Sequence, residues 1–263
     1  MTFIDTFDTY DSGFPNTGDL GQWDSAVSPT TYLHEYATGH DGKCLRIGAN
    51  STGNSYLLKN LDLSSGYNGG VAIGFWWLPN FAPNNSTAKS AMLFSLSDNS
   101  LCSCRVNYQA TNTGTSQIKA TFIGNSCTFA PTFNWNTTTY PMDGNHWYWL
   151  SFLISWGVPG QYQQVLFNAT TADDFTLSGL PWILSNTNGD GNGNPTQYLM
   201  PFTESQLATT QFIIGAKSGL ATGLNGTHYI DTIFINNYGS GFIPPIIFTI
   251  ASNPPSMTLL GIG

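Results

Sequence analysis

The chain of 263 residues carries little charge of either sign. Only 8% of its residues are charged, whereas soluble domains average about 25%. The 15 acidic residues include just two glutamates, Glu35 and Glu204, and the basic residues number seven. Because straight-chain charged residues that favour helices are scarce, the composition excludes a coiled coil and a helical bundle. The net charge of −8 also excludes a nucleic-acid-binding protein, which needs a basic face against the phosphates.

Long apolar runs are missing as well. No segment approaches the roughly 20 apolar residues that a membrane-spanning helix requires, so we expect no membrane contact. Residues 1–5 show no basic region followed by an apolar stretch, which predicts synthesis in the cytoplasm without a signal peptide. A hydrophobic content of 41% is still sufficient for a folded core. We expect one domain over residues 1–240 and an apolar, proline-containing tail over 241–263 that packs on the domain or on a partner.

The four cysteines, Cys44, Cys102, Cys104 and Cys127, lack the paired spacing of a zinc site. Cysteine behaves as a small apolar residue, which favours buried free thiols. One disulfide between Cys104 and Cys127, across adjacent strands, is the alternative.

What the sequence does contain is a repeated two-residue apolar period. Residues 71–78 are apolar on both faces, as in a central strand of a packed sandwich. Residues 91–97 alternate, with Met92, Phe94 and Leu96 on one face, and residues 118–122 and 146–156 behave similarly. A helical pattern occurs only near residues 204–208, before a strand at Gln211. This periodicity, with turn residues between the runs, predicts an all-β fold.

Two motifs carry a resemblance to a known family. The segment 144–152 (GNHWYWLSF) begins with glycine and continues through His-Trp into an apolar strand. The pair 212–216 (FIIGA) and 229–235 (YIDTIFI) reads as two closing strands. Both resemble laminin-G-like and concanavalin A-like jelly rolls. The resemblance implies a two-sheet antiparallel jelly-roll sandwich with long loops.

The opening segments, 3–10 (FIDTFDTY) and 21–25 (GQWDS), resemble the start of jelly-roll proteins from tailed bacteriophage virions. This resemblance implies a virion structural protein, in the first place a decoration or cement protein on the capsid exterior. The expected partners are other capsid or tail proteins and sister copies in a homo-oligomer. The alternative is a receptor- or glycan-binding module of the tail or of a head fibre, with a host-surface glycan as partner.

Catalytic residues of the expected kind are missing. Glycosidases on this sandwich present two glutamates, separated by an aspartate, on one strand, and a retaining mechanism needs two carboxyls about 5–5.5 Å apart. Neither Glu35 nor Glu204 lies in a patterned central strand. The sequence therefore predicts no enzymatic activity.

A glycan site is expected in the long loops. An aromatic ring can stack on the apolar face of a sugar while amide side chains bond to its hydroxyls. The candidate residues for this role are Trp135, Tyr140, Trp182, Tyr198, Asn134 and Asn136. The alternative interpretation is that these aromatic side chains are buried and cover the edge of the sandwich.

No cofactor is expected, although two weak calcium candidates exist, because Ca²⁺ prefers carboxylate, amide and backbone oxygens. The first is the glycine-rich run at 186–194, with Asn188, Asp190 and Asn192; a plain surface loop is the alternative. The second is the pair Asp5 and Asp231, which meet if the first and last strands pair. In the tail, the apolar residues expected to make assembly contacts are Ile246, Ile247, Phe248 and Met257.

Overall fold

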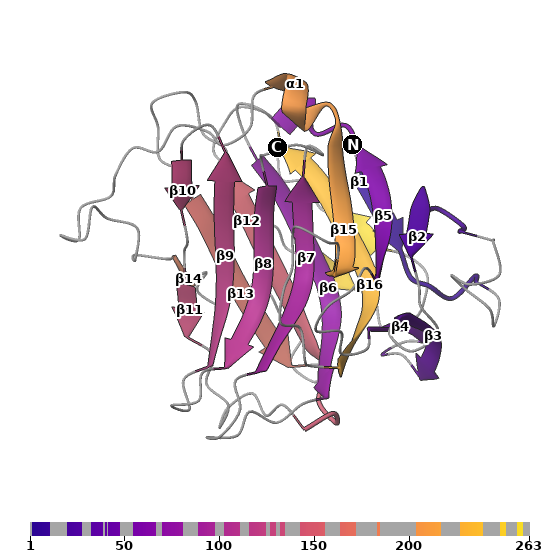
Figure 1. Cartoon of the computed structure of the whole chain (residues 1–263). Helices are drawn as coiled ribbons and strands as arrows, with labels where there is room; N and C mark the ends of the chain where they lie inside the picture. The colour runs from indigo at the N-terminus through magenta and orange to yellow at the C-terminus, as the bar shows by residue number, and fades with distance from the viewer. Residues whose placement is uncertain are drawn as a thin grey trace.

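The protein forms two antiparallel β-sheets stacked face to face in the computed structural model (Figure 1). The predicted all-β sandwich is therefore confirmed. The structure describes residues 2–10, 20–27, 33–38, 40, 42–47, 55–66, 70–80, 89–97, 103–110, 116–124, 127–129, 132–134, 143–155, 164–171, 183–184, 204–216, 227–238, 248–250 and 257–259.

The first sheet, called sheet A, has the long strands β6 and β16 near its centre. Its strands in spatial order are β14 (Ile183–Leu184), β13 (Gln164–Thr171), β12 (Tyr148–Ser155), β6 (Gly70–Asn80), β16 (Thr227–Tyr238), β4 (Lys43–Ile47) and β3 (Leu33–Thr38), with β1 (Thr2–Asp5) also paired to β16. The first strand thus pairs with a strand near the end of the chain.

The second sheet, sheet B, lies in front of sheet A in Figure 1. Its strands in order are β10 (Cys127–Phe129), β9 (Ser116–Gly124), β8 (Ser103–Ala110), β7 (Lys89–Ser97), β15 (Thr210–Ala216), β5 (Ser55–Leu61) and β2 (Ser25–Val27), with β11 (Thr132–Asn134) also paired to β9. A separate hairpin contains β17 (Phe248–Ile250) and β18 (Met257–Leu259). The expected helix is present as α1 (Glu204–Leu207), and a short 3₁₀ turn, η1, covers Ser64–Gly66.

Aromatic side chains join the two sheets. Phe75 and Phe152 from sheet A meet Phe94 and Phe212 from sheet B, and all four are essentially inaccessible to solvent. The Phe94 ring lies 5.2 Å from Phe152, 6.1 Å from Phe75 and 5.9 Å from Phe212, measured between centroids. Burying each such side chain contributes about 2–3 kcal/mol. Because successive residues of a strand point to opposite faces, this core decides which residues face outward.

Bulges in β7 and β16 shift that alternation. In β7 the register slips between Met92 and Phe94, so Leu93 and Phe94 both join the core and Met92 does not. The prediction that Met92 shares a face with Phe94 is therefore wrong. In β16 one extra residue stands between Asp231 and Phe234, where Thr232 has a φ of 45°. An extra residue reverses the parity of a strand beyond it.

The register also excludes the predicted disulfide. Strand β9 lies between β8, which contains Cys104, and β10, which contains Cys127. Two strand spacings place the Cα atoms roughly 9.6 Å apart, beyond the reach of about 7 Å that a disulfide allows. Cys44, the cysteine whose side chain the structure describes, is buried.

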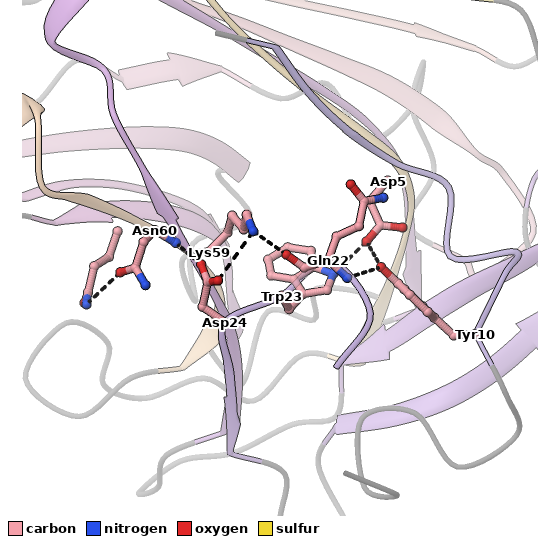
Figure 2. Close-up of polar contacts among 8 residues, drawn as sticks. Asp5, Tyr10, Gln22, Trp23, Asp24, Lys59 and Asn60 are labelled. Carbon is pink, nitrogen blue, oxygen red and sulfur yellow. Dashed lines mark hydrogen bonds and ion pairs between the residues drawn. The ribbon is translucent and has the colours of Figure 1, made fainter. Parts of the chain in front are cut away.

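The N-terminal segment is held by one buried carboxylate (Figure 2). Asp5 accepts hydrogen bonds from the Tyr10 hydroxyl, from Trp23 Nε1 at 2.7 Å and from the Phe7 amide at 2.8 Å. Phe7 has a φ of 61°, a conformation that costs a bulky residue free energy. These contacts stabilise the turn after β1 and bring residues 7–10 and Trp23 together against the core.

We expect Asp5→Asn to lower the free energy of unfolding by about 1–3 kcal/mol. The asparagine NH₂ group is itself a hydrogen-bond donor, so one of the three buried donors would lose its acceptor. Thermal and urea unfolding measure the loss. Asp62→Asn is the matched control, since Asp62 is exposed, and it should change stability by less than about 0.5 kcal/mol. Equal effects of the two substitutions would contradict the role given to Asp5.

The same carboxylate predicts a pH dependence. Burial raises the pKa of Asp5 above its usual 3.8, and the hydrogen bonds from Tyr10, Phe7 and Trp23 oppose that rise only in part. The folded protein therefore binds this proton more tightly than the unfolded chain. The resulting stabilisation is fully present below pH 3.8 and is lost as the pH rises through the raised pKa. Asp5→Asn should remove this component from unfolding curves measured across that interval; an unchanged pH profile would contradict it.

Gly74 allows a tryptophan to lie against β6. A Cβ atom at Gly74 would stand 2.6 Å from Cζ2 of Trp149, which belongs to the neighbouring strand β12. Both Trp149 and Trp76 are buried, although they lie on the face of sheet A that points away from the core.

Gly74→Ala should therefore destabilise the fold by about 1–3 kcal/mol, since a well-packed site tolerates an added methyl group poorly. Replacing Trp149 by Leu in the same chain should recover part of that loss, because the ring that clashes is gone. A double-mutant cycle from urea unfolding measures the coupling. Additive effects of the two substitutions would contradict this contact.

Candidate functional site

The two sheets differ sharply in charge. Sheet B strands contain four of the seven basic residues of the chain and none of its 15 acidic residues. Those basic residues are Lys59, Lys89, Arg105 and Lys119. Sheet A strands contain both signs, with Asp5, Glu35 and Asp231 against Lys43 and Arg46. In a protein of net charge −8, a sheet without acidic residues is a strong electrostatic asymmetry.

Arg105 lies near the middle of this sheet. Its neighbours in β8, Val106 and Tyr108, point into the core, so Arg105 and Asn107 point outward. The residues opposite Arg105 are Ser95 on β7 and Thr121 on β9, both neutral. Partial burial lowers the pKa of the Arg105 guanidinium, which nevertheless stays protonated. A partly desolvated cation gains more from an anion than a fully hydrated one.

Small polar side chains continue the outer face beside Arg105. Ser95 and Ser97 on β7 do not belong to the core, yet they are 1% and 4% exposed. Strand β15 places Gln211 opposite Ser97, and Gln211 Nε2 donates to Asn60 Oδ1 at 3.4 Å. The outer face therefore combines one central cation with small, buried hydroxyl groups and partly exposed amide groups, and the amides can bond to the hydroxyls of a ligand.

Lys59 does not take part in this outward face. It points toward the edge between the sheets, where Nζ donates to the Gln22 carbonyl oxygen at 2.5 Å and lies 3.5 Å from Asp24 Oδ1 (Figure 2). Its role is to attach the segment before β2 to β5.

Most of the predicted site residues lie outside the described residues. Of the glycan candidates, only Asn134 is described: it ends β11 and stands opposite Gln117 on β9, at the border of sheet B. The remaining candidates, Trp135, Tyr140, Trp182, Tyr198 and Asn136, lie outside, as do Asn188, Asp190, Asn192, Ile246 and Ile247. Phe248 and Met257 belong to the β17–β18 hairpin, where they stand near opposite ends of the paired register.

The expected calcium pair is not brought together. Strand β1 pairs with β16, but Asp5 is opposite Ile233 and faces the core, whereas Asp231 lies on the outer face. Asp231 Oδ2 instead accepts the amide N–H of His40 at 2.8 Å. The β16 bulge places the two carboxylates on opposite faces, because it reverses the parity between them. Across the described part of the chain, no group of three potential ligands is placed to hold a metal ion.

The sequence reasoning overlooked Arg105, Ser95 and Asn107. Ser95 lies in the strand expected at residues 91–97, and Arg105 and Asn107 lie in the strand next to it. A prediction of strands from the sequence does not say which strands are neighbours. A count of charge for each apolar run would have found the acid-free region, since Asp98 is the one acidic residue between 89 and 134. Among the described residues, no helix is long and apolar enough to cross a membrane.

No family model and no curated protein matches the chain. Solved structures do match, at low identity. Alginate lyase Aly36B is 10% identical with a TM-score of 0.50, covering 92% of this chain and 98% of the lyase. Tailspike protein 2 of an Escherichia coli O157:H7 bacteriophage is 15% identical with a TM-score of 0.48, over 78% of this chain and 24% of the tailspike.

A third match is the CBM2 module of the evolved Dit of Lactobacillus casei BL23 phage J-1. It is 10% identical with a TM-score of 0.41, over 89% of each chain. At these identities the similarity shows the fold alone. The chain is thus a jelly-roll sandwich whose structural neighbours include bacteriophage and polysaccharide-active proteins, and the laminin-G-like type is not singled out among them.

The comparison corrects the prediction of no enzymatic activity. That prediction is wrong as an exclusion, because Aly36B, which shares this fold over nearly its whole length, is a lyase. The missing glutamate pair excludes one hydrolytic mechanism only. An elimination needs a general base and a general acid, and His, Lys or Tyr side chains can fill both roles.

Proposed function

We propose that the chain recognises an acidic glycan on the outer face of sheet B. The observation that carries this proposal is the outward, partly buried Arg105 in a sheet whose strands contain no acidic residue, in a protein of net charge −8. Arg105, half-buried near the middle of this sheet, supplies a fork of donors for a sugar carboxylate. Asn107 and Gln211, both partly exposed, supply amide partners for the remaining groups of the sugar.

An acidic glycan accounts for these groups better than a nucleic acid does. The strongly negative net charge repels a polyphosphate over long range, whereas one sugar carboxylate needs only local complementarity. The fold supports the proposal, since it is the fold of an enzyme that acts on alginate, a polymer of uronic acids.

Arg105→Ala should weaken binding of alginate or hyaluronan about 10- to 100-fold, because a hydrogen bond to a charged group contributes about 1.5–3 kcal/mol. Affinity electrophoresis and calorimetry measure the loss, and added salt should weaken binding by the wild-type chain. Following the same mixtures for new unsaturated chain ends tests whether the glycan is also cleaved.

Arg46→Ala is the matched control. Arg46 is also a half-buried arginine in a strand, but it stands in sheet A, opposite Tyr229. Its replacement should leave acidic-glycan binding unchanged. Equal losses of binding in both variants would overturn the proposal. It would also be overturned if the wild-type chain bound dextran or single-stranded DNA as tightly as the acidic glycan.

The setting that we propose is the surface of a bacteriophage particle, which the resemblance of residues 3–10 and 21–25 to virion jelly rolls supports. A glycan-recognising face favours an adsorption module over a capsid decoration protein. Quantitative mass spectrometry of purified particles should then find few copies of the chain, and its deletion should abolish attachment. Many copies, with loss of capsid robustness on deletion, would instead support decoration.

A further inference from the structure

A second cluster of polar and aromatic side chains lies on the outer face of sheet A, away from Arg105. We call it the Trp147 patch, and it consists of His40, Asp143, His146 and Trp147. Trp147 directly precedes β12, two residues before the outward-facing Trp149. Asp143 forms an isolated bridge with Asn80 at the end of β6, on the same face.

The aromatic part of the patch is held firmly. The His40 ring stacks on Trp76 with 3.8 Å between centroids and 11° between planes, and its backbone amide donates to the buried Asp231. The Trp147 ring meets His40 at 6.2 Å and 80°, an edge-to-face contact. Trp147 stays half-exposed. A rigid, partly exposed indole loses little conformational freedom when a ligand stacks on it.

The polar part of the patch is equally ordered but faces solvent. Asp143 Oδ1 accepts the Asn145 amide and bonds to His146 Nδ1, both at 2.9 Å. These bonds lower the pKa of the Asp143 carboxyl, with His146 as the largest cause. The Asp143 and His146 side chains are 42% and 52% exposed.

The turn that contains these residues is anchored to β6. The Gly144 amide donates to the Pro79 carbonyl oxygen at 2.9 Å, and Gly144 has a φ of 80°. A Cβ atom at Gly144 would stand 2.6 Å from Asn80 Oδ1, so glycine permits this close approach. The backbone thus sets the positions of Asp143 and Trp147 relative to each other.

Stability alone does not account for this arrangement. Exposed ion pairs contribute about 0–1 kcal/mol, and a tryptophan that served only packing would be buried as Trp76 and Trp149 are. A half-exposed indole beside an oriented carboxylate and imidazole matches the needs of a sugar ring, which offers an apolar C–H face and a rim of hydroxyls. The exposed Asp143 carboxylate repels an anionic sugar.

We infer that the Trp147 patch is a binding site for a neutral pyranose sugar, which stacks on Trp147 and bonds to Asp143 and His146 through its hydroxyls. This site is separate from the Arg105 face, because the two lie on opposite sheets. The proposal does not rest on the acidic-glycan proposal, and either one can fail alone.

Titration of the wild-type chain with cellohexaose, laminarihexaose and mannohexaose, followed by tryptophan fluorescence and calorimetry, tests this site. At least one neutral hexasaccharide should bind. Trp147→Ala should weaken that binding at least tenfold, whereas Trp147→Phe, which keeps a ring, should lose less. Arg105→Ala should leave it unchanged.

Asp143→Asn and His146→Ala give an independent test, since both side chains are exposed and their replacement does not endanger folding. Each should weaken neutral-sugar binding about threefold or more, with unchanged thermal unfolding. The proposal is overturned if no neutral hexasaccharide binds at millimolar concentration. It is likewise overturned if bound sugar is insensitive to all of these patch substitutions.

Discussion

The packing of the two sheets through their inner faces is the constraint on which the rest of the structure depends. Phe75 and Phe152 of sheet A interlock with Phe94 and Phe212 of sheet B, so each strand must present its apolar positions to this layer. Strand geometry then assigns every intervening residue to an outer face. Arg105 and Asn107 are therefore outward residues of a core strand, and a shift of that strand by one residue would turn both of them toward the core.

The two outer faces differ in chemistry. Sheet B presents Arg105 among hydroxyl and amide side chains and contributes no acidic residue from its strands. Sheet A presents tryptophans, with Trp76 and Trp149 buried and Trp147 half-exposed near Asp143. The apolar core lies between the sheets, so a ligand bound to one outer face does not contact the other. The two binding surfaces that we propose therefore differ in charge.

Several elements were predictable from local pattern alone. The run at 71–78 is apolar on both faces and became β6, the central strand whose inner face packs on the core and whose outer face carries Trp76. The bulge at Met92 was not predictable, because the pairing partner β8 determines where the register slips. The prediction of a Cys104–Cys127 disulfide was wrong for a related reason, since the order of strands in a sheet depends on long-range pairing. The Arg105 site was missed because its neighbours come from β7 and β9, which only pairing places beside β8.

The sequence by itself determined the all-β class and the scarcity of charge and of glutamates, because composition and two-residue periodicity are local properties of the chain. Tertiary structure alone decided that four basic residues share one sheet and that His40 stacks on Trp76, 36 residues away. It also decided that Asp5 and Asp231 face opposite sides of their sheet, through one extra residue in β16. Each of these depends on which strands pair and in what register, and pairing is chosen by the burial of the whole core.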